Sequence, residues 1–376
     1  MQGDISKDNK IRIMLVDDSA VIRGALTHLL EEDPAMEIIA SIANGELAIN
    51  AAAREQPDIV ILDIEMPVMD GLTALPRIRE KSPRSKIIMF SSLTEKGAQI
   101  TMKAMALGAV ECLVKPSAGE AKSGGAFHQS LLTLIKSLCP QKVKPARKSE
   151  APISSAAPAA PRSNQNYTLR NAAGLYNGRP EILAIGSSTG GPQALFEVLK
   201  HCTGLTIPIV ITQHMPATFT KILAEHISRQ TGLTAHEGEN GMFLEGGKVY
   251  VAPGGFHMTF EKRRDGKTRI VLEDGAPVNF CKPSVEPMMD SLLSLYGNKI
   301  LGLILTGMGH DGRDSCKALS AAGGRVIAQD EASSVVWGMP GAVATAGICN
   351  AVLPLADIGP WVKKAATGLY TKPIQV

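Results

Sequence analysis

Apolar and polar residues alternate along residues 11–139 in the order expected of a parallel sheet with interleaved helices. Short apolar runs that are typical of buried strands occur at Ile11–Val16, Ile38–Ser41, Ile59–Leu62, Ile87–Phe90 and Val110–Val114. A helix-length segment follows each of the first four runs, and the first such segment has an apolar side after a possible cap at Ser19. The pattern predicts a flavodoxin-like domain with a five-stranded parallel sheet.

The pattern stops between residues 140 and 180. This stretch is rich in Pro, Ala, Ser and basic residues and has no apolar periodicity, which is typical of a mobile or semi-extended linker. A regulatory docking segment is the alternative interpretation. We therefore expect a first domain over residues 10–139, a linker over 140–180 and a second domain over 181–370.

The α/β pattern resumes at Glu181. Strands are predicted at Ile182–Ile185, Ile207–Gln213, Lys248–Ala252, Arg269–Leu272, Ile300–Thr306 and Arg325–Gln329. Helices are predicted at about Pro192–Lys200, Thr218–Gln230, Val285–Tyr296 and Asp311–Ala322. The strands at 248–252 and 269–272 flank a polar turn with Asp265-Gly266, so we expect them to form an antiparallel hairpin. The second domain is thus predicted to be a doubly wound α/β domain with an antiparallel hairpin.

Composition narrows the function classes. The 376 residues carry a net charge of only +3, which gives no reason to expect nucleic acid or a membrane surface as partner. The six cysteines have no CxxC spacing, which favours a reducing compartment. No leader-like segment is visible, and no apolar run approaches the length of a membrane span. We expect a cytoplasmic protein that is not embedded in a membrane.

Acidic residues follow the first and third predicted strands of the front domain. Asp17, Asp18 and Asp63 would meet at the carboxyl edge of the sheet, where repulsion among them favours a bound cation such as Mg²⁺. Asp63 could then attack a phosphoryl group. Ser91 and Lys115, at the ends of the fourth and fifth strands, could bind the phosphoryl oxygens. The alternative is that Asp17 and Asp18 only cap a helix.

A second chemistry follows the first strand of the rear domain. The sequence Gly186-Ser187-Ser188-Thr189-Gly190 fits the GxSxG turn between a strand and a helix, which exposes a nucleophilic serine. Ser188 would lie at the helix N-terminus, where backbone N–H groups favour a developing oxyanion. Ser187 is the competing nucleophile, but it occupies the x position of the motif. A turn that only cradles a phosphate is the alternative.

A serine nucleophile needs a base, and the base needs an orienting acid. His214 ends one predicted strand and Asp311 follows another, so both can converge on Ser188. Asp311 could instead cap the helix that it precedes, or serve in both roles. His257 is the one other histidine in a comparable place, and we interpret it as a structural residue.

The front domain resembles the response-regulator receiver family. The resemblance rests on the motifs MLVDDS, ILDIEMP and VKP and covers nearly all of residues 10–139. It implies metal-binding acids at Asp17 and Asp18, phosphorylation at Asp63 with Mg²⁺, and switch residues at Ser91 and Lys115. One departure is visible: Cys112 stands where the family usually has an aromatic switch residue.

The rear domain resembles the catalytic domain of the chemotaxis receptor methylesterases. The resemblance rests on the motifs IGSSTGG, TQHMP, APGGFHM, DGAPVN, KPSV, LTGMGHDG and QDEASSVVWGMP. It makes Ser188 the nucleophile, His214 the base and Asp311 the orienting acid. It also places the backbone N–H of Met308 in the oxyanion hole, with Thr189 beside the nucleophile.

Three residues of the rear domain depart from the family pattern. Ser187 stands where alanine is usual, and Cys281 and Glu286 stand where histidine and aspartate are frequent. Because these positions lie outside the triad, we expect them to affect substrate fit or packing rather than the mechanism.

The combined resemblance implies a phosphorylation-controlled hydrolase. Its substrates would be glutamate methyl esters, and by extension glutamine amides, on the cytoplasmic helices of methyl-accepting chemoreceptors. The phosphodonor would be the chemotaxis histidine kinase, and the unphosphorylated receiver would cover the Ser188 cleft. The same hydrolase acting on another protein ester in a pathway that does not control motility is an alternative. A DNA-binding response regulator is disfavoured because residues 181–376 lack a dense Lys/Arg stripe, and a non-catalytic interaction protein would need Ser188 to be dispensable.

Overall fold

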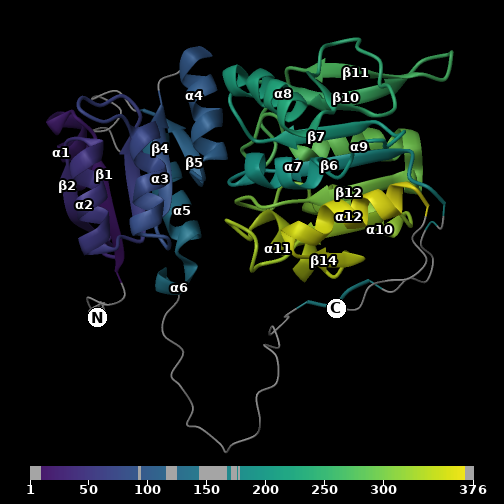
Figure 1. Ribbon diagram of the computed structural model, residues 1–376. Helices are drawn as coiled ribbons and strands as arrows, with labels where there is room; N and C mark the ends of the chain where they lie inside the picture. The colour runs from purple at the N-terminus through teal and green to yellow at the C-terminus, as the bar shows by residue number, and fades with distance from the viewer. Residues whose placement is uncertain are drawn as a thin grey trace, which may run out of the picture.

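The computed structural model describes residues 10–91, 95–115, 125–143, 167–170, 176 and 178–368. Two α/β units lie side by side in it (Figure 1). In the described part of the chain, no helix is long and apolar enough to cross a membrane.

The first unit confirms the predicted five-stranded parallel sheet. Its strand order is β2-β1-β3-β4-β5, and every neighbouring pair is parallel. The strands are β1 (Ile11–Val16), β2 (Met36–Ile42), β3 (Ile59–Asp63), β4 (Lys86–Ser91) and β5 (Glu111–Val114). The helices are α1 (Ala20–Glu31), α2 (Gly45–Glu55), α3 (Gly71–Lys81), α4 (Glu95–Ala106) and α5 (Ala126–Leu138). Ser19 caps α1 as expected, because its side chain accepts a hydrogen bond from the N–H of Ile22.

The second unit is built on a seven-stranded parallel sheet with the order β14-β13-β12-β6-β7-β9-β8. Its strands are β6 (Ile182–Ser187), β7 (Ile209–Gln213), β8 (Thr234–Glu237), β9 (Lys248–Val251), β12 (Ile300–Ile304), β13 (Arg325–Gln329) and β14 (Ala351–Leu353). Its helices are α7 (Gly191–Leu199), α8 (Ala217–Thr231), α9 (Val285–Tyr296), α10 (Arg313–Ala321), α11 (Met339–Thr345) and α12 (Leu355–Ala366), with a short 3₁₀ turn at Gly297–Lys299. Strands β8 and β14 have no counterpart in the sequence-based prediction.

The antiparallel hairpin exists, but the predicted pairing was wrong. Strand β11 (Thr268–Glu273) pairs with β10 (His257–Lys262), whereas β9 lies in the parallel sheet between β7 and β8. The reason is burial, because β9 is a short apolar run covered by protein and therefore suits the interior of a parallel sheet.

Both ends of the predicted linker pack against the folded units. Residues Pro140–Val143 form α6, and Lys142 in it binds the carboxylate of Asp58. Near the other end, Arg170 and Tyr176 donate backbone hydrogen bonds to Cys349 and Gly323 of the second unit. The central part of the predicted linker, residues 144–166, lies outside the described residues, as does Pro116.

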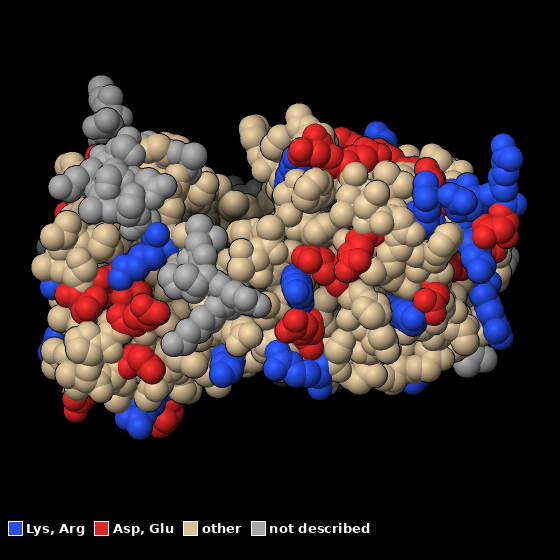
Figure 2. Space-filling view, turned by 90° about the horizontal axis from the view of Figure 1, so that it is seen from above, with Lys and Arg blue, Asp and Glu red and all other residues tan. Residues whose placement is uncertain are grey.

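The molecular face seen in Figure 2 carries charges of both signs. On its described part, basic residues are interrupted by acidic ones and do not form one continuous band. This distribution agrees with the low net charge and offers no nucleic-acid track there.

Candidate active site and phosphorylation site

The structure brings the three predicted acids of the first unit together at the carboxyl edge of its sheet. Oxygen atoms of Asp17, Asp18 and Asp63 all lie within 4.8 Å of one another. Asp17 and Asp63 are buried, whereas Asp18 is exposed. A cluster of carboxylate oxygens is the donor set that Mg²⁺ prefers, so these residues fit that ion.

Lys115 holds two of these acids in place. Its Nζ lies 2.7 Å from Oδ2 of Asp63 and 2.9 Å from Oδ2 of Asp17. Burial raises the pKa of Asp63 to about 6, although the hydrogen bond and positive charge of Lys115 oppose the shift. Ser91 lines the same pocket, and its hydroxyl donates to the carbonyl of Gly97 at the start of α4.

In the second unit, Ser188 lies in a tight turn between β6 and α7. Gly190, with a φ of +77°, provides the left-handed conformation that starts α7. The segment after β12 passes against the turn, because Ser188 N–H donates to Thr306 and a Cβ on Gly307 would come within 2.8 Å of the Ser188 Cβ. Gln213 completes the support: its side chain donates to the Ser188 carbonyl and accepts from the Ser187 hydroxyl.

His214 and Asp311 form the predicted pair. The distance from His214 Nε2 to Asp311 Oδ2 is 2.8 Å, and both side chains are largely buried. Burial lowers the pKa of His214, but the hydrogen bonds of Asp311 and Cys281 outweigh it and raise the pKa to about 9. Burial likewise raises the pKa of Asp311, and its hydrogen bonds, first of all to His214, bring the pKa below its usual value.

Asp311 does not cap the following helix. Helix α10 begins at Arg313 and has Gly312 at its cap position, whereas Asp311 accepts from the N–H of Val285 at the start of α9. Its other oxygen accepts from Asn279 and Ser284. Neither of these two supporting residues was predicted from the sequence, although Asn279 ends the DGAPVN motif and Ser284 lies within the KPSV motif.

Cys281 lies beside the second ring nitrogen of His214. Its Sγ is 3.4 Å from Nδ1. Since Nε2 is bound to Asp311, Nδ1 is the nitrogen left for a substrate or for Ser188. Among the described residues, the Ser188 hydroxyl makes no hydrogen bond to His214. The Cys281 thiol lies instead at Nδ1, the nitrogen to which the serine hydroxyl would have to bind.

The remaining candidates have clear positions. His257 is buried and bonds through its two ring nitrogens to the backbone at Ala276 and Ser284, which supports the structural interpretation. Glu286 accepts from the first amides of α10, those of Asp314 and Ser315, so this departure from the family pattern serves packing. Within the described chain, Met308 N–H donates to no backbone carbonyl, which leaves it available to a ligand beside Ser188.

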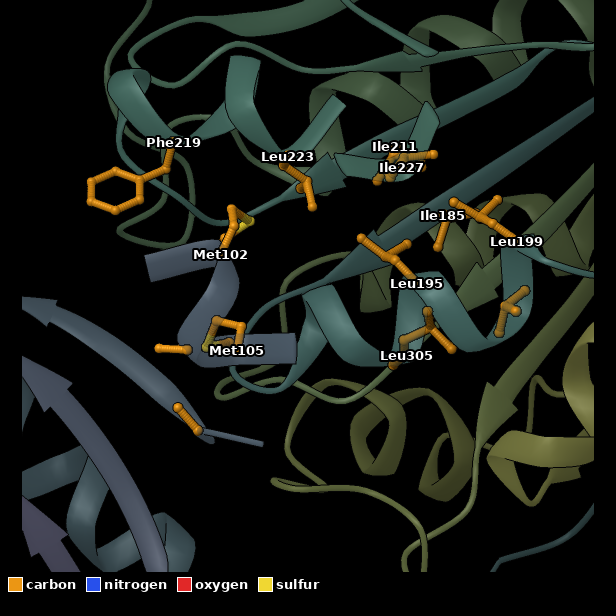
Figure 3. Close-up of a cluster of buried hydrophobic side chains, with 14 of the residues drawn as sticks. Met102, Met105, Ile185, Leu195, Leu199, Ile211, Phe219, Leu223, Ile227 and Leu305 are labelled. Carbon is orange, nitrogen blue, oxygen red and sulfur yellow. The ribbon is translucent and has the colours of Figure 1, made fainter. Parts of the chain in front are cut away.

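The two units meet next to the serine turn. In Figure 3, Met102 and Met105 of α4 face Phe219 and Leu223 of α8. All four side chains are almost completely buried.

Polar contacts join the units beside the apolar ones. The Gln193 side chain at the start of α7 donates to the carbonyls of Met105 and Ala109. Thr189, the residue after Ser188, is hydrogen-bonded to Glu111 of β5. Met308 packs against the apolar cluster of the first unit. The first unit thus contacts the edge of the serine site.

The fold and the two sites define a receiver joined to a serine hydrolase. Residues 13–121 match the model of the response regulator receiver domain, and residues 183–362 match the model of the CheB methylesterase family. A protein-glutamate methylesterase/protein-glutamine glutaminase of group 2 operon from Rhodospirillum centenum is 47% identical, with 97% of this chain and 96% of the relative covered. A protein-glutamate methylesterase/protein-glutamine glutaminase from Azospirillum brasilense is 50% identical over 95% of this chain and 93% of its own.

A solved structure is similar to the second unit. The Thermotoga maritima CheB methylesterase catalytic domain is 36% identical, covers 50% of this chain and 99% of its own, and has a TM-score of 0.47. From the near full-length relatives, this chain belongs to the family of protein-glutamate methylesterases/protein-glutamine glutaminases with a receiver domain. As a member of this family it is a hydrolase of the CheB methylesterase type.

Proposed function

We propose that Ser188 is the nucleophile of this hydrolase, with His214 as base and Asp311 as orienting acid. Ser188 Oγ attacks the γ-carbonyl while Nδ1 of His214 takes its proton, and the backbone N–H groups of Met308 and Thr189 bind the oxyanion. The alcohol leaves as methanol, or an amide nitrogen leaves as ammonia, after protonation by His214. Water, deprotonated by the same nitrogen, then releases glutamate from the acyl-enzyme. The observation that carries this proposal is the buried His214–Asp311 hydrogen bond beside the serine turn.

We further propose that Asp63 is the phosphorylation site of residues 10–139, which act as the receiver. Asp17, Asp18 and Asp63 would hold Mg²⁺, which neutralises charge on the incoming phosphoryl group when it is bound. Lys115 already contacts Asp63, and after phosphorylation it would pair with a phosphoryl oxygen instead. Ser91 would donate to another phosphoryl oxygen and so give up its hydrogen bond to the carbonyl of Gly97.

Loss of the Ser91–Gly97 hydrogen bond would couple phosphorylation of Asp63 to the interface between the units. Gly97 lies in α4, the helix whose Met102 and Met105 pack against the catalytic unit, formed by residues 181–370. A shift of α4 would weaken that packing and uncover the serine turn, where Glu111 now contacts Thr189 and Met308 packs on the first unit. A coupling of about 1–3 kcal/mol would change the activity by about 5–150-fold. Residues 140–180 would tether the two units during this motion.

The substrates would be methylated chemoreceptors, and the phosphodonor would be the chemotaxis histidine kinase. This assignment is supported by membership in the methylesterase family and by the receiver that precedes the hydrolase. Demethylation adds a negative charge to the receptor and so changes its signalling output.

Methanol release from methylated receptor membranes tests these assignments. We expect Ser188→Ala to reduce the rate at least about a thousandfold, since removal of a triad nucleophile has effects of this size or larger. A small-molecule phosphodonor with Mg²⁺ should stimulate the wild type, while Asp63→Asn or removal of Mg²⁺ with EDTA should abolish the stimulation and leave the basal rate. Stimulation that persists in Asp63→Asn would contradict the proposed phosphorylation site, and full activity of Ser188→Ala would contradict the nucleophile.

A further inference from the structure

A two-residue turn beside the catalytic pair has an unusual residue at its tip. Val278 and Cys281 exchange both backbone hydrogen bonds across the turn. The central residues, Asn279 and Phe280, have φ values of +51° and +63°. Positive φ at both central positions defines a type I′ turn, which strongly favours glycine in the second place. A bulky phenylalanine there is strained, and strained residues cluster at functional sites.

The residues on either side of Phe280 bind the catalytic pair directly. Asn279 Nδ2 donates to Asp311 Oδ1 at 2.9 Å, and Cys281 Sγ lies 3.4 Å from His214 Nδ1. Phe280 lies between these two residues, and consecutive Cα atoms are about 3.8 Å apart. Its backbone is therefore fixed next to the acid and the base.

The Phe280 side chain is exposed to solvent. Its relative exposure is 102%, compared with 40% for Phe243 and Phe256. The receiver is packed against the catalytic unit in this structure, and yet it does not cover Phe280. An aromatic ring in solvent at the rim of a catalytic site indicates a binding surface, since aromatic side chains dominate contact energy at interfaces.

We propose that Phe280 is a substrate-docking residue. Its ring packs on an apolar side chain of the protein segment that carries the esterified glutamate, and so holds the ester at Ser188. The occupant is a protein because the family acts on glutamate within proteins. This inference rests on the proposed role of Ser188 and extends it to the recognition of the substrate.

The test compares a protein substrate with a small ester in the full-length chain activated by a phosphodonor and Mg²⁺. The protein substrate is methylated receptor membranes, and the small ester is the γ-methyl ester of N-acetylglutamate amide. Phe280→Gly removes the ring and fits the positive φ. We expect KM for the receptor to rise about tenfold with kcat nearly unchanged, as for loss of one aromatic contact. The kcat/KM for the small ester should not change.

Two matched variants complete the design. Phe243→Ala removes another exposed ring, which lies near Lys267 rather than the catalytic pair, and should leave both substrates unaffected. Phe280→Leu keeps an apolar contact, so its KM for the receptor should lie between that of the wild type and that of Phe280→Gly. Binding is measured separately by co-sedimentation of Ser188→Ala with the receptor membranes, where adding Phe280→Gly should weaken the affinity about tenfold.

Several outcomes would overturn the proposal. An equal loss on both substrates would mean that Phe280 only positions the turn, and unchanged receptor kinetics and binding would mean that it contacts no substrate. Self-association of the wild type that Phe280→Gly abolishes, measured by sedimentation, would assign the ring to contacts between copies of the chain. Failure of the proposed function is distinguishable, because the wild type itself would then release no Ser188-dependent methanol.

Discussion

At the scale of single residues, the two nitrogens of His214 divide the chemistry of the site. Nε2 is bound to Asp311, so in the proposed mechanism Nδ1 accepts the proton of Ser188, and Cys281 lies against that nitrogen. In the sequence, Cys281 is visible as a departure from the family pattern, but nothing there indicates that it lies at the base. Only the folded turn brings residue 281 to residue 214.

The contact with Cys281 predicts a change in pH dependence. His214 acts as a base only when neutral, so with its pKa at about 9 the rate should rise with pH up to that value. Cys281→Ala removes one of the interactions that raise this pKa, so the half-maximal rate should move to lower pH. If the half-maximal rate moves down by about one pH unit, the neutral fraction of His214 at pH 7 increases about tenfold.

The pH–rate profile of kcat/KM measures this effect. Cys281→Ser keeps a hydrogen-bonding group and should lie between the wild type and Cys281→Ala. A profile of Cys281→Ala that equals the wild type or moves to higher pH would contradict the prediction. Stability offers a second readout: a raised histidine pKa stabilises the fold fully below pH 6.5, and this contribution disappears as the pH rises through about 9.

At the scale of elements, backbone conformation and lack of space both favour glycine at position 190, in the turn between β6 and α7. Gly190 has a φ of +77°, and a Cβ there would lie 2.7 Å from Cβ of Val335. Gly204 has a similar φ of +83° but nothing within 4 Å of such a Cβ. A comparison of alanine substitutions at Gly190 and Gly204 therefore separates the cost of backbone strain from the cost of steric contact.

Gly190→Ala should destabilise the protein by about 2–5 kcal/mol, since left-handed strain costs about 1–2 kcal/mol and overpacking about 1–3 kcal/mol. It should also lower kcat by displacing the serine turn. Gly204→Ala should cost only the strain and leave kcat unchanged. Thermal unfolding and initial rates measure both effects, and equal behaviour of the two variants would show that the contact with Val335 has no consequence.

Strand pairing was the element-level feature that the sequence predicted least well. The hairpin was expected from two strands near one polar turn, but His257–Lys262 was overlooked, because only two apolar residues, Met258 and Phe260, alternate with its polar ones. The sequence of β11 does not show whether it pairs with β9 or β10, because this depends on which of those two strands joins the parallel sheet. The receiver strands were predicted correctly because each is a separate apolar run between helices.

At the scale of the whole molecule, we propose that the contact between the two units limits access to the serine site. Gln193 donates to two carbonyls near the end of α4, those of Met105 and Ala109, so its removal would leave both without that donor. The net contribution of such hydrogen bonds is about 0.5–1.5 kcal/mol each. They are therefore large enough to bias the docked state.

Gln193→Ala should raise the basal methylesterase rate by about 5–100-fold and reduce the further stimulation by a phosphodonor by a similar factor. Gln230 is exposed and lines a groove between the units together with Ala106 and Gln193, so Gln230→Ala is the control and should change neither value. Initial rates with and without phosphodonor and Mg²⁺ provide both numbers. A lower basal rate in Gln193→Ala would mean that the glutamine supports catalysis rather than docking.

The two α/β units and the residue types at their strand ends could be predicted from the order of amino acids alone. Apolar periodicity is local, and parallel strands deliver their carboxyl ends to one edge, so Asp63, Lys115 and Ser188 could be predicted in their places. Folding in three dimensions was needed to reveal what approaches these residues from elsewhere: Cys281 at the base, Gln193 against α4, and Phe280 in solvent. Such contacts join residues far apart in the chain, and no local pattern of polarity encodes them.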